Sequence, residues 1–260
     1  MGRRQIRRWL QYRRYARDAS GLIGKDETAL REYFSGKGRK RSNSDKVFCI
    51  GFNKTGTTSL ERILKDLGLR MPHQGLQENL LAHVFSSGRY DILKRFVSDF
   101  DAFQDVPFSQ DSLYVALDAL FPNSKFILTV RDADAWYESL TRFHQKVFGF
   151  KSIDEAGPDF WKGIRNNYFY EQNKQFVTVV ENGKPREDWS LLYDRDFCIS
   201  KYLKRNDEII RYFLHRPNDF LCVDLSKSKD TREICQFLDV GDDKVGPIPH
   251  LNSSVVPKSR

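Results

Sequence analysis

The stretch VFCIGFNKTGTTSL, residues Val47–Leu60, decides the predicted fold. Its first four residues, Val47–Ile50, are all apolar, which predicts a buried strand. A turn bounded by glycines follows, and the hydroxyl residues Thr57–Ser59 are typical of a helix start. This order directs backbone N–H groups and a helix N-terminus toward one small volume, next to the ammonium of Lys54. The stretch therefore predicts a site for an anion of phosphate size.

The lysine of this turn stands in an unusual place for a nucleotide-binding loop. The Walker pattern has four residues between its first glycine and a Gly-Lys-Ser/Thr sequence, whereas here Lys54 precedes Gly56. A plain strand-to-helix turn with good caps is the alternative interpretation. A cation facing a helix N-terminus is unfavourable without an anion, which favours the anion site. The candidate anion-binding residues are Asn53, Lys54, Thr55, Gly56, Thr57, Thr58 and Ser59.

Apolar strand-like runs alternate with helical patterns along the rest of the chain. The predicted strands are Val47–Gly51, Ala102–Val106, Lys125–Val130 and Phe220–Leu225. The predicted helical segments are Thr57–Leu67, Gln77–Phe96, Ser109–Leu120, Ala133–Val147, Ser152–Asn182, Asp194–Leu214 and Asp230–Leu238, with a turn at 181–183. Such alternation predicts the α/β class, with a central parallel sheet flanked by helices on both faces. The run KFILTV is almost wholly apolar, as expected of a strand buried on both faces.

The charge of the chain is unevenly distributed. The 260 residues have a net charge of +8; residues 1–45 contain 13 Lys/Arg and 5 Asp/Glu, and the remainder contains 30 of each. We expect residues 1–45 to form a basic helical arm and linker, and residues 46–260 to form one α/β domain. The arm has an amphipathic pattern with two interpretations: contact with a membrane surface or anionic partner, or docking on the domain.

The sequence predicts a cytoplasmic protein, with membrane-peripheral placement through the arm as the alternative. It contains neither an apolar run of about 18 residues nor the apolar centre of a signal peptide. The four cysteines lack the spacing of a metal site, and we predict that they are reduced residues of the core; they are Cys49, Cys198, Cys222 and Cys235. No metal site is expected, because the five histidines are scattered along the chain. No nucleic-acid partner is expected, since the domain has no net charge.

Two further groups of residues follow predicted strands. Arg131 comes directly after the buried strand Lys125–Val130, and Ser139 lies eight residues further along the next helix. A guanidinium and a hydroxyl can both donate to a phosphate, although Arg131 can also pair with a nearby aspartate. Asp105 ends another strand, where a carboxylate can take a proton from a substrate or serve as a cap or ion-pair partner. Ligands of parallel sheets bind beyond the carboxyl ends of the strands, so these groups are expected to meet.

Taken together, these motifs resemble those of sulfotransferases that use 3′-phosphoadenosine 5′-phosphosulfate. The order Lys54-Thr55-Gly56-Thr57-Thr58 is similar to their 5′-phosphosulfate loop, and Arg131 with Ser139 matches their 3′-phosphate pair. Cytosolic members have a His-Leu-Pro segment whose histidine is the general base, and Asp105-Val106-Pro107 stands in its place here. Other branches use a carboxylate base. The resemblance covers about residues 46–259.

The resemblance implies a three-layer sandwich like that of P-loop nucleotide hydrolases and the activity of a sulfotransferase. It implies 3′-phosphoadenosine 5′-phosphosulfate as the donor co-substrate, bound by the turn, Arg131 and Ser139. It further implies Lys54 and Asp105 as catalytic residues. The C-terminal segment resembles the loop that closes over the nucleotide, which makes Lys258 a candidate ligand. The acceptor is expected to carry a hydroxyl or an amine and to be a glycan, a lipid or a small molecule.

Two other functions remain open from the residues alone. One is a nucleotide-dependent kinase on a related scaffold, against which the displaced lysine counts. The other is a non-enzymatic anion-binding or nucleic-acid-binding protein led by the basic arm. The aromatic region Phe160–Tyr170 also has two interpretations, as the lining of an acceptor pocket or as the core of a helical cap.

Overall fold

The computed structural model describes residues 33–34, 42, 44–81, 84, 87–150, 152, 155–162 and 168–249. In chain order the elements are β1 (Val47–Cys49), α3 (Thr57–Asp66), α4 (Gln74–Glu78), α5 (Tyr90–Val97), β2 (Ala102–Phe103), α6 (Leu113–Leu120), β3 (Lys125–Thr129), α7 (Ala133–Phe148), α8 (Pro158–Trp161), α9 (Tyr168–Val177), β4 (Thr178–Glu181), β5 (Lys184–Glu187), η3 (Trp189–Leu191), α10 (Arg195–Tyr212), β6 (Phe220–Val223), α11 (Arg232–Phe237) and η4 (Asp242–Lys244). The predictions for Lys258 and for almost all of the arm lie outside these residues.

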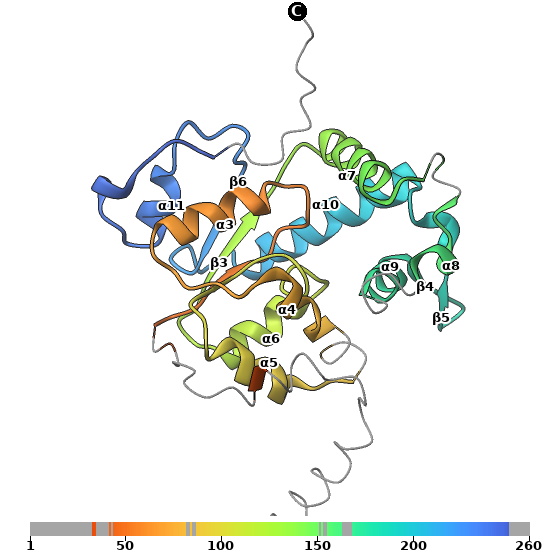
Figure 1. The fold of residues 1–260 in the computed structure, drawn as a ribbon, viewed down its shortest axis with the longest axis horizontal. Coiled ribbons are helices and arrows are strands. Elements are labelled where there is room, and N and C mark those ends of the chain that lie inside the picture. The colour runs from red at the N-terminus through yellow and green to blue at the C-terminus, as the bar shows by residue number, and fades with distance from the viewer. Residues whose placement is uncertain are drawn as a thin grey trace, which may run out of the picture.

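The main sheet confirms the predicted α/β class. Among the described residues it has four strands in the order β2-β1-β3-β6, and each neighbouring pair is parallel. Successive strand residues point to opposite faces, which sorts the core into two halves. Phe48 and Phe126 pack with α5, α6 and α10 on one face, and Cys49 and Ile127 pack with α3 and α11 on the other. Helices therefore cover both faces of the sheet, as Figure 1 shows.

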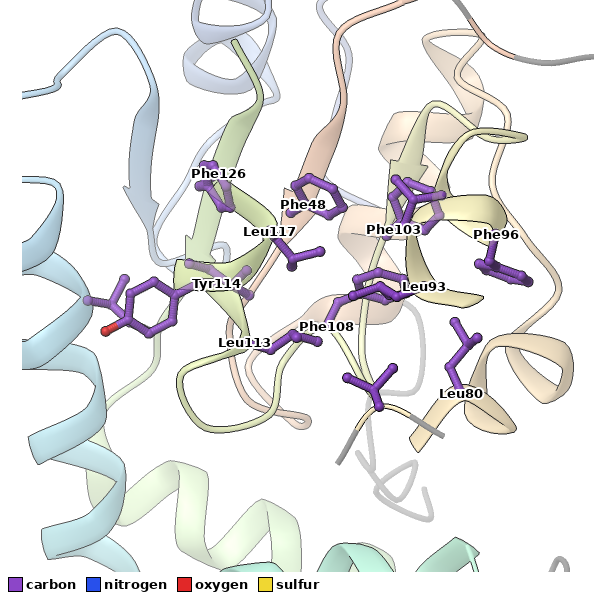
Figure 2. Packing of buried hydrophobic residues seen from close by; sticks show 14 of the residues in the cluster. Phe48, Leu80, Leu93, Phe96, Phe103, Phe108, Leu113, Tyr114, Leu117 and Phe126 are labelled. Atoms are coloured by element: carbon purple, nitrogen blue, oxygen red, sulfur yellow. The ribbon is translucent and has the colours of Figure 1, made fainter. Parts of the chain in front are cut away.

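Aromatic side chains dominate one face of the sheet (Figure 2). The Phe48 ring lies with its centroid 5.3 Å from that of Phe103, 5.9 Å from that of Phe108 and 5.5 Å from that of Phe126. All four side chains are fully buried. Pairs at such spacing add to the hydrophobic gain of burial, and here they join three adjacent strands. This packing holds the carboxyl ends of β1, β2 and β3 in fixed relative positions.

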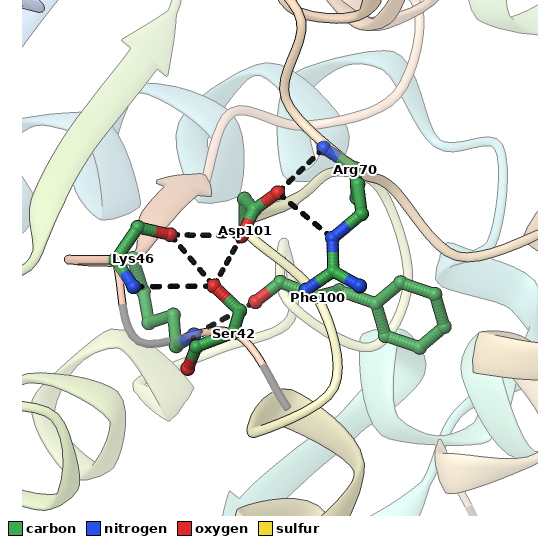
Figure 3. A network of polar contacts seen from close by, with 6 residues as sticks. Ser42, Lys46, Arg70, Phe100 and Asp101 are labelled. Carbon is green, nitrogen blue, oxygen red and sulfur yellow. Dashed lines mark hydrogen bonds and ion pairs between the residues drawn. The ribbon is translucent and has the colours of Figure 1, made fainter. Parts of the chain in front are cut away.

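A polar network anchors the start of the sheet (Figure 3). The Asp101 carboxylate accepts from the backbone N–H of Arg70 at 2.8 Å, from its Nε at 3.3 Å, and from the Ser42 hydroxyl. The Lys46 ammonium donates to the Phe100 carbonyl at 2.8 Å. Burial lowers the pKa of Lys46, with Asp101 opposing the shift. These contacts tie the residues before β1 to those before β2, so the two strands enter the sheet together.

Some predicted elements differ from the structure. The helical region Gln77–Phe96 is divided, because α5 begins after Gly88, whose φ of 60° is left-handed. The segment Ser152–Asn182 ends in a strand, because β4 pairs with β5 in an antiparallel hairpin. The turn between them was predicted; its residues Asn182 (φ 51°) and Gly183 (φ 74°) are typical of a two-residue hairpin turn. The β-branched residues before this Asn-Gly pair were a hairpin signal that the helical prediction overlooked.

The prediction of four buried cysteines is wrong for one of them. Cys49, Cys198 and Cys235 are buried, whereas Cys222 is exposed, and all four are free thiols. Cys222 lies in β6, the last strand of the sheet, where packing covers less of the surface. Among the helices described, none is long and apolar enough to cross a membrane.

Candidate functional site

The order of the strands brings three predicted site residues, Lys54, Asp105 and Arg131, to one edge of the sheet. β1 lies between β2 and β3, and all three run in the same direction, so their following loops leave the same end of the sheet. These loops carry Lys54, Asp105 and Arg131 respectively. The charges interact: Arg131 lowers the pKa of Lys54 and Asp105 raises it, although burial is the largest influence and lowers it. The predicted convergence of the three side chains is therefore present.

Close packing against β3 fixes the shape of the loop after β1. A Cβ atom added to Gly51 would lie 2.2 Å from Thr129 Oγ1 and 2.5 Å from its carbonyl oxygen, so no side chain fits there. The Thr55 hydroxyl lies 2.5 Å from the Phe52 carbonyl and 2.7 Å from the Thr129 hydroxyl, and Thr55 is only 3% exposed. The Thr55 side chain thus faces the sheet and holds the loop in shape.

The N-terminus of α3 is left available by this loop. Its N-cap is Gly56, in a left-handed conformation with φ of 100°, and within the described part of the chain no side chain caps the helix. Thr57 and Ser59 are buried, whereas Thr58 is exposed. The hydroxyl residues therefore do not act as the N-cap, contrary to the plain-turn interpretation. The first N–H groups of a helix have no intrahelical partner and suit an anion.

The Lys54 side chain lies in a confined position. Lys54 itself has a left-handed backbone with φ of 67°, and its ammonium lies 3.8 Å from the centre of the Phe143 ring. Contact with an aromatic face favours the charged amine. Burial and the nearby Arg131 guanidinium disfavour it, and the net effect is a lowered pKa. An anion bound between Lys54 and Arg131 would relieve both unfavourable influences.

Helix α7 is docked directly onto the loop. Trp136 Nε1 donates to the Asn53 carbonyl at 3.0 Å, and the indole stacks on Tyr202 of α10 with centroids 4.4 Å apart. The Tyr202 hydroxyl in turn accepts from the Arg131 N–H and donates to the Arg131 carbonyl, both at 2.9 Å. Ser139 lies on the same helix and is partly buried. The loop after β1, the residue after β3 and α7 therefore form one connected unit.

Asp105 occupies an environment suited to a proton acceptor. It has a left-handed backbone with φ of 59°, and its Oδ1 accepts from the Val106 N–H at 2.8 Å. Burial raises the pKa of Asp105 to about 6; the Val106 N–H opposes the rise, Glu78 and Glu61 add to it, and Lys54 opposes it. A carboxylate that titrates close to neutral pH can accept a proton and release it again. The N-cap alternative finds no support, since α6 begins later, at Leu113, with Ser112 as its cap residue.

Two residues near Lys54 were not predicted. Phe143 contacts its ammonium, and His144 is buried with Nδ1 2.7 Å from the Tyr193 hydroxyl. Burial, and secondarily the charge of Lys54, lowers the pKa of His144 to about 4, so this imidazole is neutral at pH 7. Phe143 follows Ser139 by four residues, which places both on one face of α7 and was the available signal. No comparable signal marked His144.

The aromatic region after α7 forms a separate small core, the cap, which comprises α8, α9, β4, β5 and η3. In Figure 1 these elements group to one side of the main sheet. Trp161 is fully buried and packs with Phe150 and Tyr193. The described part of Phe160–Tyr170 is thus a cap core, whereas residues 163–167 lie outside the described chain. Phe176 of α9 packs against Phe52 of the loop, and a cavity of about 40 Å³ beside this contact has Asn53 and Asn173 in its wall.

Comparison with known families adds an independent observation. Residues 46–255 match the family model described as a sulfotransferase domain, which is most of the chain. The chain belongs to the sulfotransferase family. The sulfotransferase is accordingly an enzyme of sulfuryl transfer, and of the three functions considered from the sequence this is the supported one. No curated protein matches the chain.

The sulfotransferase match covers every predicted site residue except Lys258. Of these residues, Lys54, Asp105 and Arg131 interact electrostatically, and Asn53 joins them to α7 through its carbonyl. Within the described residues, no group of three or more His, Cys, Asp or Glu side chains is arranged to hold a metal ion.

Proposed function

We propose that this sulfotransferase moves the sulfuryl group of 3′-phosphoadenosine 5′-phosphosulfate onto a hydroxyl or amine acceptor. The observation that carries the proposal is the parallel order of β2, β1 and β3, whose following loops bring Asp105, Lys54 and Arg131 to one edge of the sheet. Two cations and one carboxylate that titrates near neutral pH are what this chemistry requires. The cations suit the anionic donor, and the carboxylate suits the proton of the acceptor.

The donor binds along the edge of the sheet. The first N–H groups of α3, together with Thr57, Thr58 and Ser59, hold the 5′-phosphate. Arg131 and Ser139 hold the 3′-phosphate, which ATP lacks. Lys258 completes the nucleotide site from the C-terminal segment. Support comes from the uncapped N-terminus of α3 and from the tyrosine that fixes Arg131 at both its N–H and its carbonyl.

We write the transfer step with the side chains of the chain alone, so that every bond formed is matched by a bond broken. The acceptor hydroxyl or amine attacks sulfur in line, its proton passes to Asp105, and a new S–O or S–N bond forms. The bond between sulfur and the bridging phosphate oxygen breaks, and adenosine 3′,5′-bisphosphate leaves. Lys54 stabilises the negative charge that develops on that bridging oxygen. Positioning and charge stabilisation carry the catalysis, as in related group transfers.

The acceptor class is proposed to be a glycan, a lipid or a small molecule with a hydroxyl or amine. Peripheral attachment of a cytoplasmic enzyme to a membrane through the basic arm is the companion proposal for its location. Residues 1–45 would then serve as a separate attachment segment and residues 46–260 as the catalytic domain. Vesicle sedimentation with and without residues 1–45 tests this arrangement, and equal sedimentation of both forms would refute it.

Binding of the donor product tests the nucleotide assignment without knowledge of the acceptor. In titration calorimetry we expect adenosine 3′,5′-bisphosphate to bind more tightly than ATP with magnesium. Arg131→Ala should reduce this preference, because the forked guanidinium recognises the 3′-phosphate. Tighter binding of ATP with magnesium would favour the kinase alternative and overturn the proposed donor.

Transfer of sulfur-35 from labelled donor to a panel of glycans, lipids and small alcohols or amines then tests the activity. Lys54→Ala should reduce transfer by roughly 100-fold to 1,000-fold, the scale of one lost oxyanion donor. The matched control is Arg62→Ala, which removes an exposed cation from α3 that pairs with Asp66 at 2.9 Å. Equal rates for Lys54→Ala and the control would rule out the catalytic role of Lys54.

A further inference from the structure

A second cavity lies along α10, outside the residues assigned to sulfuryl transfer. Its volume is about 320 Å³, within the range of small-molecule sites. The side chains of Lys201, Lys204 and Arg205 line it from the helix, and Asp111 and Phe197 contribute to its wall. No member of the proposed donor-binding set lines this cavity. It is therefore a separate concavity with an unusual concentration of cations.

Arg205 is the unusual member of this group, because its charge is buried without a carboxylate partner. The residue is only 6% exposed. Its Nε donates to the Asp111 carbonyl at 3.1 Å and its Nη1 to the Ile50 carbonyl at 2.9 Å. Its Nη2 has no hydrogen-bond partner among the described residues. Buried guanidinium groups are normally paired with an anion, and a buried unpaired charge is strongly unfavourable.

The Arg205 guanidinium nevertheless remains charged at neutral pH. Burial lowers its pKa to about 10, and the charges of Asp111 and Glu208 oppose that shift. Both carboxylates are themselves exposed to water. Proteins tolerate a buried arginine of this kind when an anion is available to complete its hydrogen bonds. The structure thus contains a cation prepared for a negative partner that the described chain does not supply.

The two lysines leave the cavity positively charged. Lys201 donates to the carbonyl oxygens of Gln175, at 3.3 Å, and Phe176, which are neutral groups. Lys204 is 3.9 Å from the Glu208 carboxylate, a loose pair at the surface. Within the lining, three cations therefore face two exposed carboxylates. The surplus charge and the size of the cavity both favour an anionic organic molecule.

We propose that this cavity binds the oxyanion group, carboxylate or phosphate, of a small molecule through Lys201, Lys204 and Arg205. The ammonium groups attract the anion, and the Arg205 guanidinium adds its positive charge from the cavity wall. The Phe197 ring gives an apolar wall to the carbon part of the ligand. This site goes beyond the proposed sulfuryl transfer and does not depend on it.

The cavity is physically linked to the loop that carries Lys54. Arg205 bonds to the carbonyl of Ile50, at the beginning of that loop, and its guanidinium lies 4.7 Å from the centre of the Phe52 ring. An anion that pulls on Arg205 therefore acts on two residues that precede Lys54.

Calorimetric titration of the full-length protein with inorganic phosphate, and separately with malonate, tests the site. We expect wild-type protein and Lys54→Ala to bind one anion in this cavity with equal affinity. Arg205→Met should weaken binding at least about tenfold, the scale of a lost charged hydrogen bond. Lys204→Gln should weaken it about twofold to fivefold, as expected for an exposed charge. The tighter of the two probes identifies the oxyanion class.

The matched control is Arg211→Gln, which removes one exposed charge from α10 at a pair with Asp207, outside the cavity. Its affinity should equal that of the wild type. Loss of binding in Lys54→Ala would place the anion at the donor loop and overturn the proposal. So would an absence of binding at millimolar anion, or equal weakening by Arg211→Gln and Lys204→Gln. If Arg205→Met does not fold, the comparison of these two surface variants decides.

Discussion

Replacement of Lys54 by glycine should separate the stability of this fold from its activity. Lys54 has a φ of 67°, in the left-handed region. For a residue with a Cβ atom this conformation costs about 1–2 kcal/mol, and glycine avoids that cost. Glycine in turn loses about 0.5–1 kcal/mol more conformational entropy on folding. The difference leaves Lys54→Gly about 0.5–1 kcal/mol more stable than Lys54→Ala.

The difference in stability between these two variants reports only the cost of the backbone conformation at residue 54. Both remove the ammonium, whose pKa is lowered in the folded state by burial and by Arg131. A lowered lysine pKa means that folding disfavours the charged amine, so this charge subtracts from stability at neutral pH. Both variants gain from that change equally, and both lose the contact with Phe143. Only the cost of the left-handed conformation differs between them.

Urea denaturation at pH 7 measures the difference, and a thermal scan should show Lys54→Gly unfolding about 1–4 °C above Lys54→Ala. Both variants should transfer the sulfuryl group roughly 100-fold to 1,000-fold more slowly than wild type. If Lys54→Gly proved less stable than Lys54→Ala, residue 54 would not be strained in the folded protein. Wild-type transfer by either variant would remove Lys54 from the mechanism.

Three other changes test the loop and the proposed base. Gly51→Ala should destabilise the fold by more than about 2 kcal/mol in urea denaturation, since its Cβ atom would lie 2.5 Å from a backbone oxygen. The control is Gly246→Ala, whose Cβ atom would have no described atom within 4 Å and which should leave the stability unchanged. The transfer rate should fall as the pH drops through about 6, because Asp105 acts in its unprotonated form. Asp105→Asn should lower the rate, and the rate of this variant should no longer depend on pH around 6. The raised pKa also means that ionisation of Asp105 reduces stability, fully above about pH 6 and not at all below its ordinary pKa of 3.8. Asp105→Asn should therefore be more stable than wild type at about pH 8 and should approach wild-type stability near about pH 3; an equal difference in stability at both pH values would exclude the shift. Trp136→Phe should cost about 1 kcal/mol and weaken nucleotide binding, because the bond to the loop carbonyl is lost; unchanged affinity in calorimetry would show that α7 does not position the loop.

The strands were predictable where the local sequence and the packing demand the same residues. The run KFILTV is apolar because both faces of β3 are covered, and the same condition shaped Val47–Ile50. The general rule that ligands gather at the carboxyl ends of a parallel sheet then predicted that the three loops meet, but it did not give the order of the strands. On this rule the sequence alone predicts that Lys54, Asp105 and Arg131 lie together.

Features that depend on contacts between distant residues were not predictable. Thr55 was predicted as a residue of the anion-binding loop, but nothing in the local sequence showed that its hydroxyl bonds to Thr129, 74 residues further along the chain. Nothing in the periodicity of α10 marks Arg205 as buried and unpaired, because its neighbours Ile50 and Asp111 come from other elements. The neutral state of His144 likewise arises from tertiary packing. Local patterns carry no information about such partners.

Thr129 has a consequence for engineering this enzyme toward other donors. It is fully buried and is not itself among the predicted donor-binding residues, yet its side chain and backbone leave no room for a Cβ atom at residue 51, and its hydroxyl bonds to that of Thr55. Libraries that vary only the residues facing the donor would keep this template and retain the original loop shape. A new loop shape requires Gly51, Thr55 and Thr129 to change together, and their effects will not be additive. A single substitution in this group is therefore not expected to give a new loop shape.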